Sequence, residues 1–242
     1  MGVLCGANWT IFDYQRGRNS NFCQAHLRDE KHSSTVAFSR PICGGTLEIL
    51  GSGCWNGGAK WQRSVNGTNH TIVYVDRQSI SDFRYRNWTF VNEGNYDVVV
   101  LASELHDINT PLGPDFYEAP LQTVFGRQLE THLRQIQSWH KGPILYIGAW
   151  ATHPKHREAS WWWAAALTPV TNLAYVARSV VASLGGDASK AVVRHLDLIR
   201  PTLPFREWTS DGVHLFHPKP MDQLARLVWH DIAILTAHHP AP

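Results

Sequence analysis

The chain has 242 residues, enough to bury the core of one α/β domain or of two smaller domains. Its 22 basic and 20 acidic residues give a net charge of +2 with histidine neutral, so the charge signature of a nucleic-acid-binding protein is absent. No apolar run reaches the roughly 18 residues that a membrane-spanning helix needs, so no membrane span is expected.

The first 70 residues lack a regular pattern. They are rich in Gly, Ser and Asn, and Thr46–Leu50 is the one short strand that we expect before residue 60. All four cysteines of the chain lie here: Cys5, Cys23, Cys43 and Cys54. Four cysteines allow three pairings, and we interpret this part as loops held by disulfides rather than as a core element. The alternative is four free buried thiols in a cytosolic protein.

Four N-glycosylation sequons lie in the first third of the chain, at Asn8, Asn66, Asn69 and Asn87. Because this modification acts only in the secretory pathway, the sequons predict a protein of the Golgi lumen or the extracellular space. Met1–Thr10 has neither a basic segment nor a long apolar segment of the kind that forms a signal peptide. We therefore expect the sequence to be a fragment or to begin at a mis-predicted start.

From residue 71 the pattern becomes regular. Apolar and β-branched runs predict four strands, at Thr71–Asp76, Asp97–Ala102, Ile144–Ala149 and Ala191–Ile199. Helical spacing predicts three helices, at Leu121–Trp139, Val170–Leu184 and about Pro220–Thr236. Strands that alternate with helices imply right-handed crossovers and a parallel sheet. We expect one α/β domain over residues 1–242, with a loop-rich part up to 70 and a regular core over 71–237.

Three loops follow predicted strands, and each carries histidine: Ser103–Asp107, Trp150–His156 and Asp211–His217. Reactive groups in open α/β sheets lie on such loops, at the carboxyl ends of the strands. In the last loop Asp211 and His214 are three residues apart with Gly212 between them, so one tight turn can bring a carboxylate and an imidazole together. A Ser-His-Asp hydrolase needs this pair; the alternative is an ordinary surface turn.

The segments YDVVVLASELHDI (Tyr96–Ile108) and WTSDGVHLFHP (Trp208–Pro218) together resemble the SGNH hydrolase superfamily, and in particular its PC-esterase branch. The resemblance implies a three-layer α/β/α sandwich with a mainly parallel sheet, and an enzyme that moves or removes acyl groups on glycans in the secretory pathway. It implies that Asp211 orients His214 as the general base and that no cofactor or metal is required. Gly6, Ser103 and His106 would lie in the pocket and oxyanion region.

The chain departs from the family at two blocks. Gly6-Ala7-Asn8 stands where the family has Gly-Asp-Ser, and Asn8 has no nucleophilic oxygen. Ser52 is a second candidate, but it lacks a following helix and lies too close to the middle block. In that middle block Ala102 and Glu104 replace Asn and Gly, and an ionised glutamate opposes an oxyanion. Either the protein is a degenerate member, or its first exon is wrong.

Two functions therefore stay open: an acyl-esterase or O-acyltransferase that acts on an acylated glycan or glycoprotein, and a non-catalytic pseudoenzyme that binds a glycan or a protein. A metal hydrolase is the third chemistry considered, because histidine pairs occur at His153 and His156, at His214 and His217, and at His238 and His239. No HExxH motif supports it, so no metal is predicted. Trp161–Trp163 is interpreted as partly buried and partly a sugar-binding rim.

Overall fold

The computed structural model describes residues 38–42, 45–50, 58–65, 68–75, 96–102, 119–156, 166–185, 191–209, 212 and 218–239. The chain divides into two compact units, Met1–Arg77 and Gln78–Pro242. Each unit is described by itself, and the expectation of a single domain stays a prediction.

The first unit contains a four-stranded antiparallel sheet in the order β1-β2-β3-β4. Its strands are β1 (Phe38–Ile42), β2 (Gly45–Leu50), β3 (Gly58–Val65) and β4 (Thr68–Val75). Val65 pairs with Thr68, so only Asn66 and Gly67 connect β3 to β4. Asn-Gly is the dipeptide that two-residue hairpins favour, because both positions tolerate positive φ.

This sheet corrects two expectations. The strand at Thr46–Leu50 is confirmed as β2, but the interpretation of the surrounding residues as loops is wrong for β1 and β3. Thr71–Val75 is a strand as predicted, yet it lies in β4 and pairs antiparallel with β3 instead of belonging to the βα core. The sequence of β3 is polar and therefore does not predict a strand. Its hairpin partner β4 is rich in β-branched residues, so it does.

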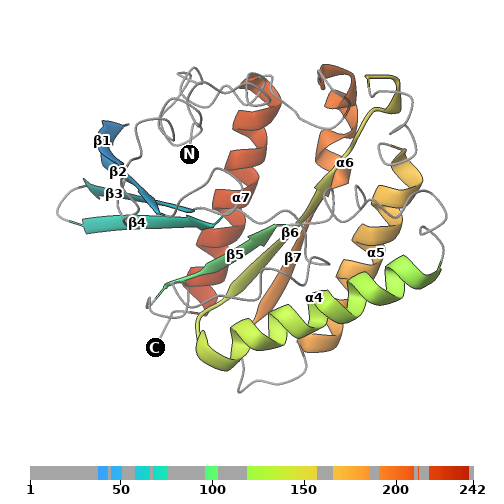
Figure 1. Cartoon of the computed structure of the whole chain (residues 1–242), viewed down its shortest axis with the longest axis horizontal. Helices are drawn as coiled ribbons and strands as arrows, with labels where there is room; N and C mark the ends of the chain where they lie inside the picture. Colours follow the sequence, from blue (N-terminus) through green and yellow to red (C-terminus); the bar gives the residue numbers. More distant parts are fainter. Residues whose placement is uncertain are drawn as a thin grey trace, which may run out of the picture. The chain divides into compact units, whose positions relative to one another are not determined.

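The second unit has an α/β fold with a parallel three-stranded sheet in the order β5-β6-β7, as Figure 1 shows. The strands are β5 (Val99–Ala102), β6 (Ile144–Trp150) and β7 (Val193–Leu198). The helices α4 (Ala119–Trp139) and α5 (Leu167–Leu184) connect them, and α7 (Pro218–His238) follows. These elements confirm the predicted alternation, whose physical basis is a central strand with buried residues on both faces.

Three short helical segments that the sequence pattern does not predict follow the last two strands, one after β6 and two after β7. They are η6 (Pro154–His156), α6 (Ile199–Thr202) and η8 (Leu203–Trp208). Asp197 helps to turn the chain out of β7, because its Oδ1 accepts a 3.0 Å hydrogen bond from the amide of Ile199. No helix in the described part of the chain is long and apolar enough to cross a membrane.

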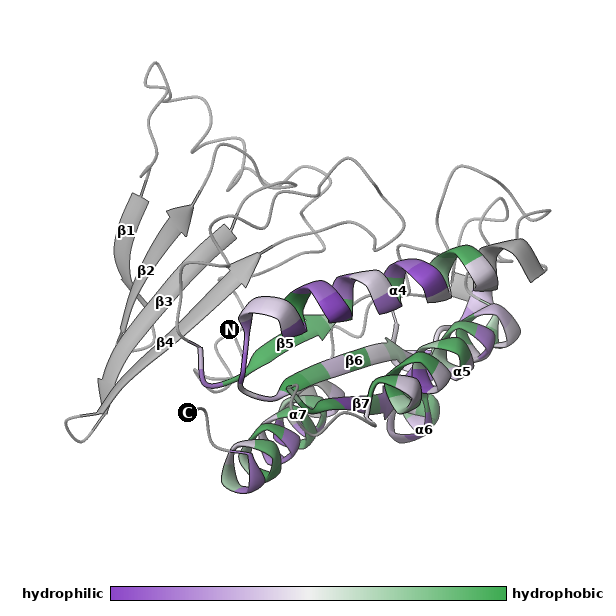
Figure 2. Ribbon diagram, turned by 90° about the horizontal axis from the view of Figure 1, so that it is seen from below, coloured by the Kyte–Doolittle hydropathy of each residue, from purple (hydrophilic) through white to green (hydrophobic). Residues whose placement is uncertain are grey.

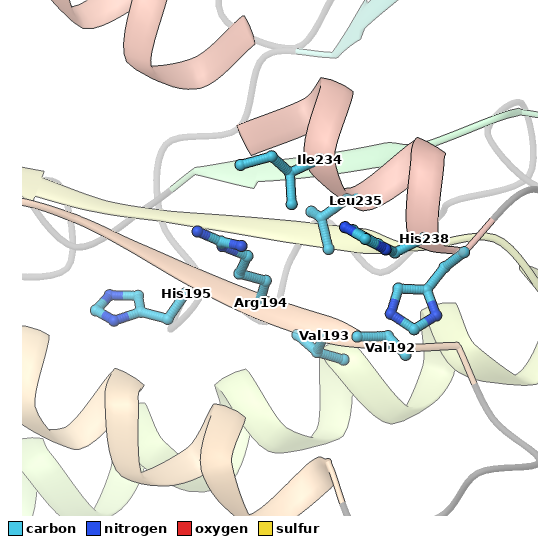
Figure 3. A pocket seen from close by; sticks show the side chains of 8 residues that line it. Val192, Val193, Arg194, His195, Ile234, Leu235 and His238 are labelled. Atoms are coloured by element: carbon cyan, nitrogen blue, oxygen red, sulfur yellow. The ribbon is translucent and has the colours of Figure 1, made fainter. Parts of the chain in front are cut away.

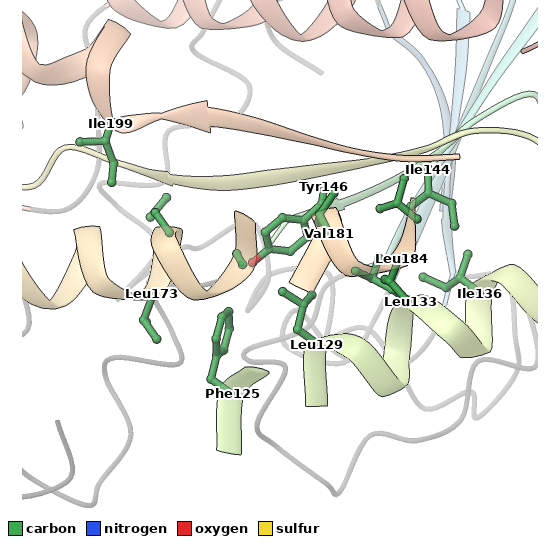
Figure 4. Close-up of a cluster of buried hydrophobic side chains, with 14 of the residues drawn as sticks. Phe125, Leu129, Leu133, Ile136, Ile144, Tyr146, Leu173, Val181, Leu184 and Ile199 are labelled. Carbon is green, nitrogen blue, oxygen red and sulfur yellow. The ribbon is translucent and has the colours of Figure 1, made fainter. Parts of the chain in front are cut away.

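The main core lies between the sheet and the helices α4 and α5. Phe125, Leu129 and Leu133 recur every four residues along α4 and are fully buried, as is Tyr146 of β6. Figure 4 shows these side chains gathered against the sheet, and Figure 2 shows the apolar residues concentrated where the helices meet the strands. Burying an apolar side chain of this size contributes about 1.5–3 kcal/mol, so this cluster is a main source of the stability of the second unit.

Candidate functional site

The residues predicted to act lie outside the described part of the structure. This applies to Asp211 and His214, to the substituted nucleophile position Asn8, and to the pocket residues Gly6, Ser103 and His106. The same holds for Ser52 and Glu104, for the four cysteines and for Trp161–Trp163. What the structure does describe is Gly212, within the late motif, and the loop that follows β6.

Hydrogen bonds join the loop after β6 to the segment that follows β7. The amide of Ala151 donates to Oγ1 of Thr202 at 2.7 Å. The amide of His153 donates to the carbonyl oxygen of Gly212 at 2.8 Å. The imidazole of His153 contacts the carboxylate of Glu207, with 2.8 Å between Nε2 and Oε1. These bonds hold the Gly212 backbone next to the carboxyl end of the central strand, where reactive groups of parallel sheets are found.

Gly212 has a left-handed backbone conformation. Its φ is 80°, in the left-handed region, and the residue is buried. A side chain in this region costs roughly 1–2 kcal/mol because Cβ approaches the following carbonyl oxygen, so glycine is the suitable residue. The tight turn between Asp211 and His214 stays a prediction, because both residues lie outside the described part of the chain.

His153 and Glu207 differ sharply in exposure. The imidazole is buried, with 5% of the side chain exposed, whereas 62% of the Glu207 side chain is exposed. An ionised carboxylate only accepts hydrogen bonds, so Nε2 of His153 carries the hydrogen in this pair. Nε of Arg206 lies 4.0 Å from the same carboxylate oxygen. The carboxylate is thus held at the surface by a buried group beneath it.

Sequence reasoning missed Glu207 as a site residue. It contacts His153 across a separation of 54 residues, and neither residue type nor spacing connects the two. The one available signal was its place directly before the late motif, which begins at Trp208.

Phe205 and Trp208, which lie on either side of Glu207 in the sequence, form an aromatic surface. The rings of Phe205 and Trp208 lie 5.4 Å apart between centroids at an interplanar angle of 59°. Phe205 packs against the small buried cluster of Leu198 and Leu224, while 41% of Trp208 and 40% of Leu203 are exposed. The result is an anchored indole, three residues before Asp211, with accessible apolar surface.

The described residues contain no group of three His, Cys, Asp or Glu side chains that could hold a metal ion. Within the candidate site, the described imidazole of His153 is engaged with Glu207. Of the other histidines that the metal alternative needs, His214 and His217 lie outside the described residues, and the structure describes the backbone of His156 but not its side chain.

A cavity of about 440 Å³ lies at the other end of β7. Figure 3 shows its walls: residues of α7, among them Ile234, Leu235 and His238, face the start of β7 at Val192–His195. Arg194 at this wall pairs with the buried carboxylate of Asp231 at 2.5 Å. Since ligands of parallel sheets bind at the carboxyl ends of strands, this cavity at an amino end is not the candidate site.

His195, which also lines this cavity, has a stacked ring and a lowered pKa. Its ring stacks on Tyr146 with centroids 5.6 Å apart at 26°, on the side of the sheet away from Arg194. Burial lowers the pKa of His195, while the negative charge of Asp197 raises it and the positive charge of Arg178 lowers it. Burial also lowers the pKa of His140, although its hydrogen bond to the carbonyl of Pro143 raises it.

Comparison of the chain with protein-family models, curated proteins and solved structures yields no match. The likeness to the SGNH hydrolases therefore rests on the two motifs, Tyr96–Ile108 and Trp208–Pro218, alone.

Proposed function

We propose that the protein is an acyl-esterase or O-acyltransferase that acts on glycans, with Asp211 orienting His214 as the general base. The observation that supports the proposal most strongly is the hydrogen bond from the amide of His153 to the carbonyl of Gly212, at 2.8 Å. It ties the residue between acid and base to the loop that leaves the carboxyl end of β6. A surface turn unrelated to a site has no need for this buried connection.

The proposed chemistry follows from the two side chains. The imidazole of His214 takes the proton of the attacking hydroxyl, and the carboxylate of Asp211 fixes the tautomer and stabilises the imidazolium that forms. Ser103 directly follows Ala102, which pairs with Ile147 of β6. This register favours a place for Ser103 and His106 at the same edge of the sheet, where donors to an oxyanion are needed.

The proposed three-layer sandwich has support in the side-chain alternation of β6. Tyr146 packs in the cluster with α4 and α5, whereas the next residue, Ile147, packs with Leu224 and Leu227 of α7. Successive residues of a strand point to opposite faces, so helices on both faces of the sheet account for the two clusters.

A glycan substrate is supported by the aromatic surface beside the motif. Sugar rings present C–H groups on one face and hydroxyls at the edge, which suits an exposed indole next to a carboxylate. Trp208 and Glu207 are consecutive, and both are accessible. The proposed place of action is the secretory pathway, which the four sequons of the first third favour.

A second candidate, a non-catalytic glycan-binding protein, is favoured by one residue. Asn8 occupies the position of the family's nucleophile and cannot form an acyl-enzyme. Such a protein would bind a glycan with the same pocket and aromatic surface but would not hydrolyse or transfer an acyl group.

Labelling with a fluorophosphonate tests the proposal, because the reagent reacts only with an activated serine. We expect the unmodified protein to be labelled and His214→Ala to lose labelling. His230→Ala, which removes an exposed histidine of α7, serves as the matched control and keeps full labelling. Equal labelling of both variants excludes His214 as the base. Absence of labelling in the folded, unmodified protein rejects the esterase and leaves the binding protein.

A further inference from the structure

We infer that His153 is the positioning residue of the proposed site, because it binds both ends of the segment Glu207–Gly212. Its side chain contacts Glu207 at the first residue of the segment, and its backbone amide binds Gly212 at the last. Asp211 directly precedes Gly212 in the chain. The inference rests on the proposed function for the role of Asp211, but its geometry is independent of any reaction.

A positioning residue must itself be fixed, and His153 is. It is 4% exposed and follows β6, the central strand of the sheet. Two residues before it, the amide of Ala151 is bound to the buried hydroxyl of Thr202. The next residue, Pro154, has a fixed φ and opens η6. Both bonds to the segment therefore start from a rigid reference.

His140 shows what a buried histidine without this role looks like. It is also 4% exposed, but its ring contacts the carbonyl of Pro143, three residues away, at 3.2 Å. That contact closes the local turn between α4 and β6. The imidazole of His153 instead contacts Glu207, which is 54 residues away in the sequence and has a side chain that is 62% exposed. Packing of the core does not require a contact with such an exposed group.

Position matters at such a site because catalysis tolerates little displacement. A shift of about 1 Å in a catalytic group can lower the rate about 100-fold, and rigid support from neighbouring side chains keeps the geometry. The contact between His153 and Glu207 supports the first residue of the segment. The backbone hydrogen bond to Gly212 supports only the last residue.

The test is amide hydrogen exchange of peptides that cover residues 207–212, measured on the full chain without ligand. We expect His153→Ala to speed exchange of this segment about ten-fold, as loss of a charge-assisted hydrogen bond implies. His153→Gln should restore most of the protection, because its amide can still donate to Glu207. His140→Ala removes an equally buried imidazole and should leave residues 207–212 unchanged.

Glu207→Ala provides a variant that will not unfold the protein, since its side chain is mostly exposed. It should speed exchange of the same segment, and combining it with His153→Ala should add little, because one contact is lost in both cases. Exchange that does not change in Glu207→Ala, or that rises equally in His140→Ala and His153→Ala, overturns the inference.

A kinetic measurement then links the inference to the site. If the esterase is active, His153→Ala should lower kcat and leave KM near its original value, since the imidazole is buried and its loss displaces Asp211, the group that orients the base, rather than a group on the sugar-facing surface. Unaltered kcat contradicts the positioning role even when exchange increases. An inactive protein rejects the proposed function alone, because the exchange experiment decides whether His153 holds the segment.

Discussion

His153 and Gly212 are joined by a 2.8 Å hydrogen bond from the amide of the first to the carbonyl oxygen of the second. This bond connects the loop after the central strand to the only residue of the late Asp-Gly-x-His motif that the structure describes. It places Gly212 at the carboxyl edge of the sheet, so changes on either side of this bond should affect folding as well as function.

Gly212→Ala should lower the free energy of unfolding by roughly 1–2 kcal/mol, because alanine is strained at a φ of 80°. Chemical denaturation measures the effect. Gly185→Ala is the control, since Gly185 ends α5 with a φ of −76°, which any residue adopts. Equal stability of the two variants would show that the turn at Gly212 relaxes without cost.

Thr202→Val should destabilise the protein by about 1–3 kcal/mol, because it leaves the buried amide of Ala151 without its acceptor. Thr202 is fully buried, and valine has nearly the same shape. Thr171→Val is the comparison: its hydroxyl only donates back to Leu167 and Thr168 within α5, so the expected change is within about 0.5 kcal/mol. A loss no larger in Thr202→Val than in Thr171→Val contradicts the role of this bond.

Stability should fall as the pH is lowered below about 6.5, the ordinary pKa of histidine. Burial lowers the pKa of His140 and of His195 in the folded chain, so the unfolded chain binds protons in this window that the folded chain does not. The free energy of unfolding therefore rises with pH through the window. Urea denaturation at pH 5.5 and 7.5 measures the difference.

His195→Phe isolates one of these two groups. Phenylalanine keeps the stacked ring against Tyr146 but cannot be protonated, so the difference in stability between pH 5.5 and 7.5 should shrink. An unchanged difference would mean that His195 does not contribute to the pH dependence.

Trp208→Ala should weaken binding of a glycan probe such as methyl β-D-galactopyranoside about ten-fold or more, if the indole stacks on the sugar. Saturation-transfer NMR or calorimetry measures it. Trp229→Ala is a suitable control, because Trp229 on α7 is 44% exposed, close to the 41% of Trp208. An equal effect of both substitutions, or no binding to the unmodified protein, removes the aromatic surface as support for a glycan substrate.

The sequence predicts the second unit well, for a physical reason. Ile144–Ala149 is apolar without alternation, as a strand buried on both faces must be, and α4 and α5 carry clear apolar stripes. In the first unit the sequence predicts β2 and most of β4, but not β1, β3 or the antiparallel pairing, because β1 and β3 carry many polar residues. Asn66-Gly67 was interpreted as part of a glycosylation site, although the same dipeptide favours a hairpin.

The candidate site was predictable only in outline. The loop Trp150–His156 was expected at the carboxyl end of a strand, and its hydrogen bond to Gly212 agrees with that expectation. The contact between His153 and Glu207 was not predictable, because it joins distant residues and depends on η8, which forms where two prolines interrupt the pattern after β7. Roles for Asp211, His214, Ser103 and His106 stay predictions.

The most direct test of the proposed function is the distance, in an experimental structure, from the ring nitrogens of His214 to the nearest serine hydroxyl. The proposal predicts a serine oxygen within about 3.5 Å of one ring nitrogen and the carboxylate of Asp211 at the other. An imidazole that faces Asn8, with every serine hydroxyl beyond that distance, would contradict the esterase and favour the non-catalytic binding protein.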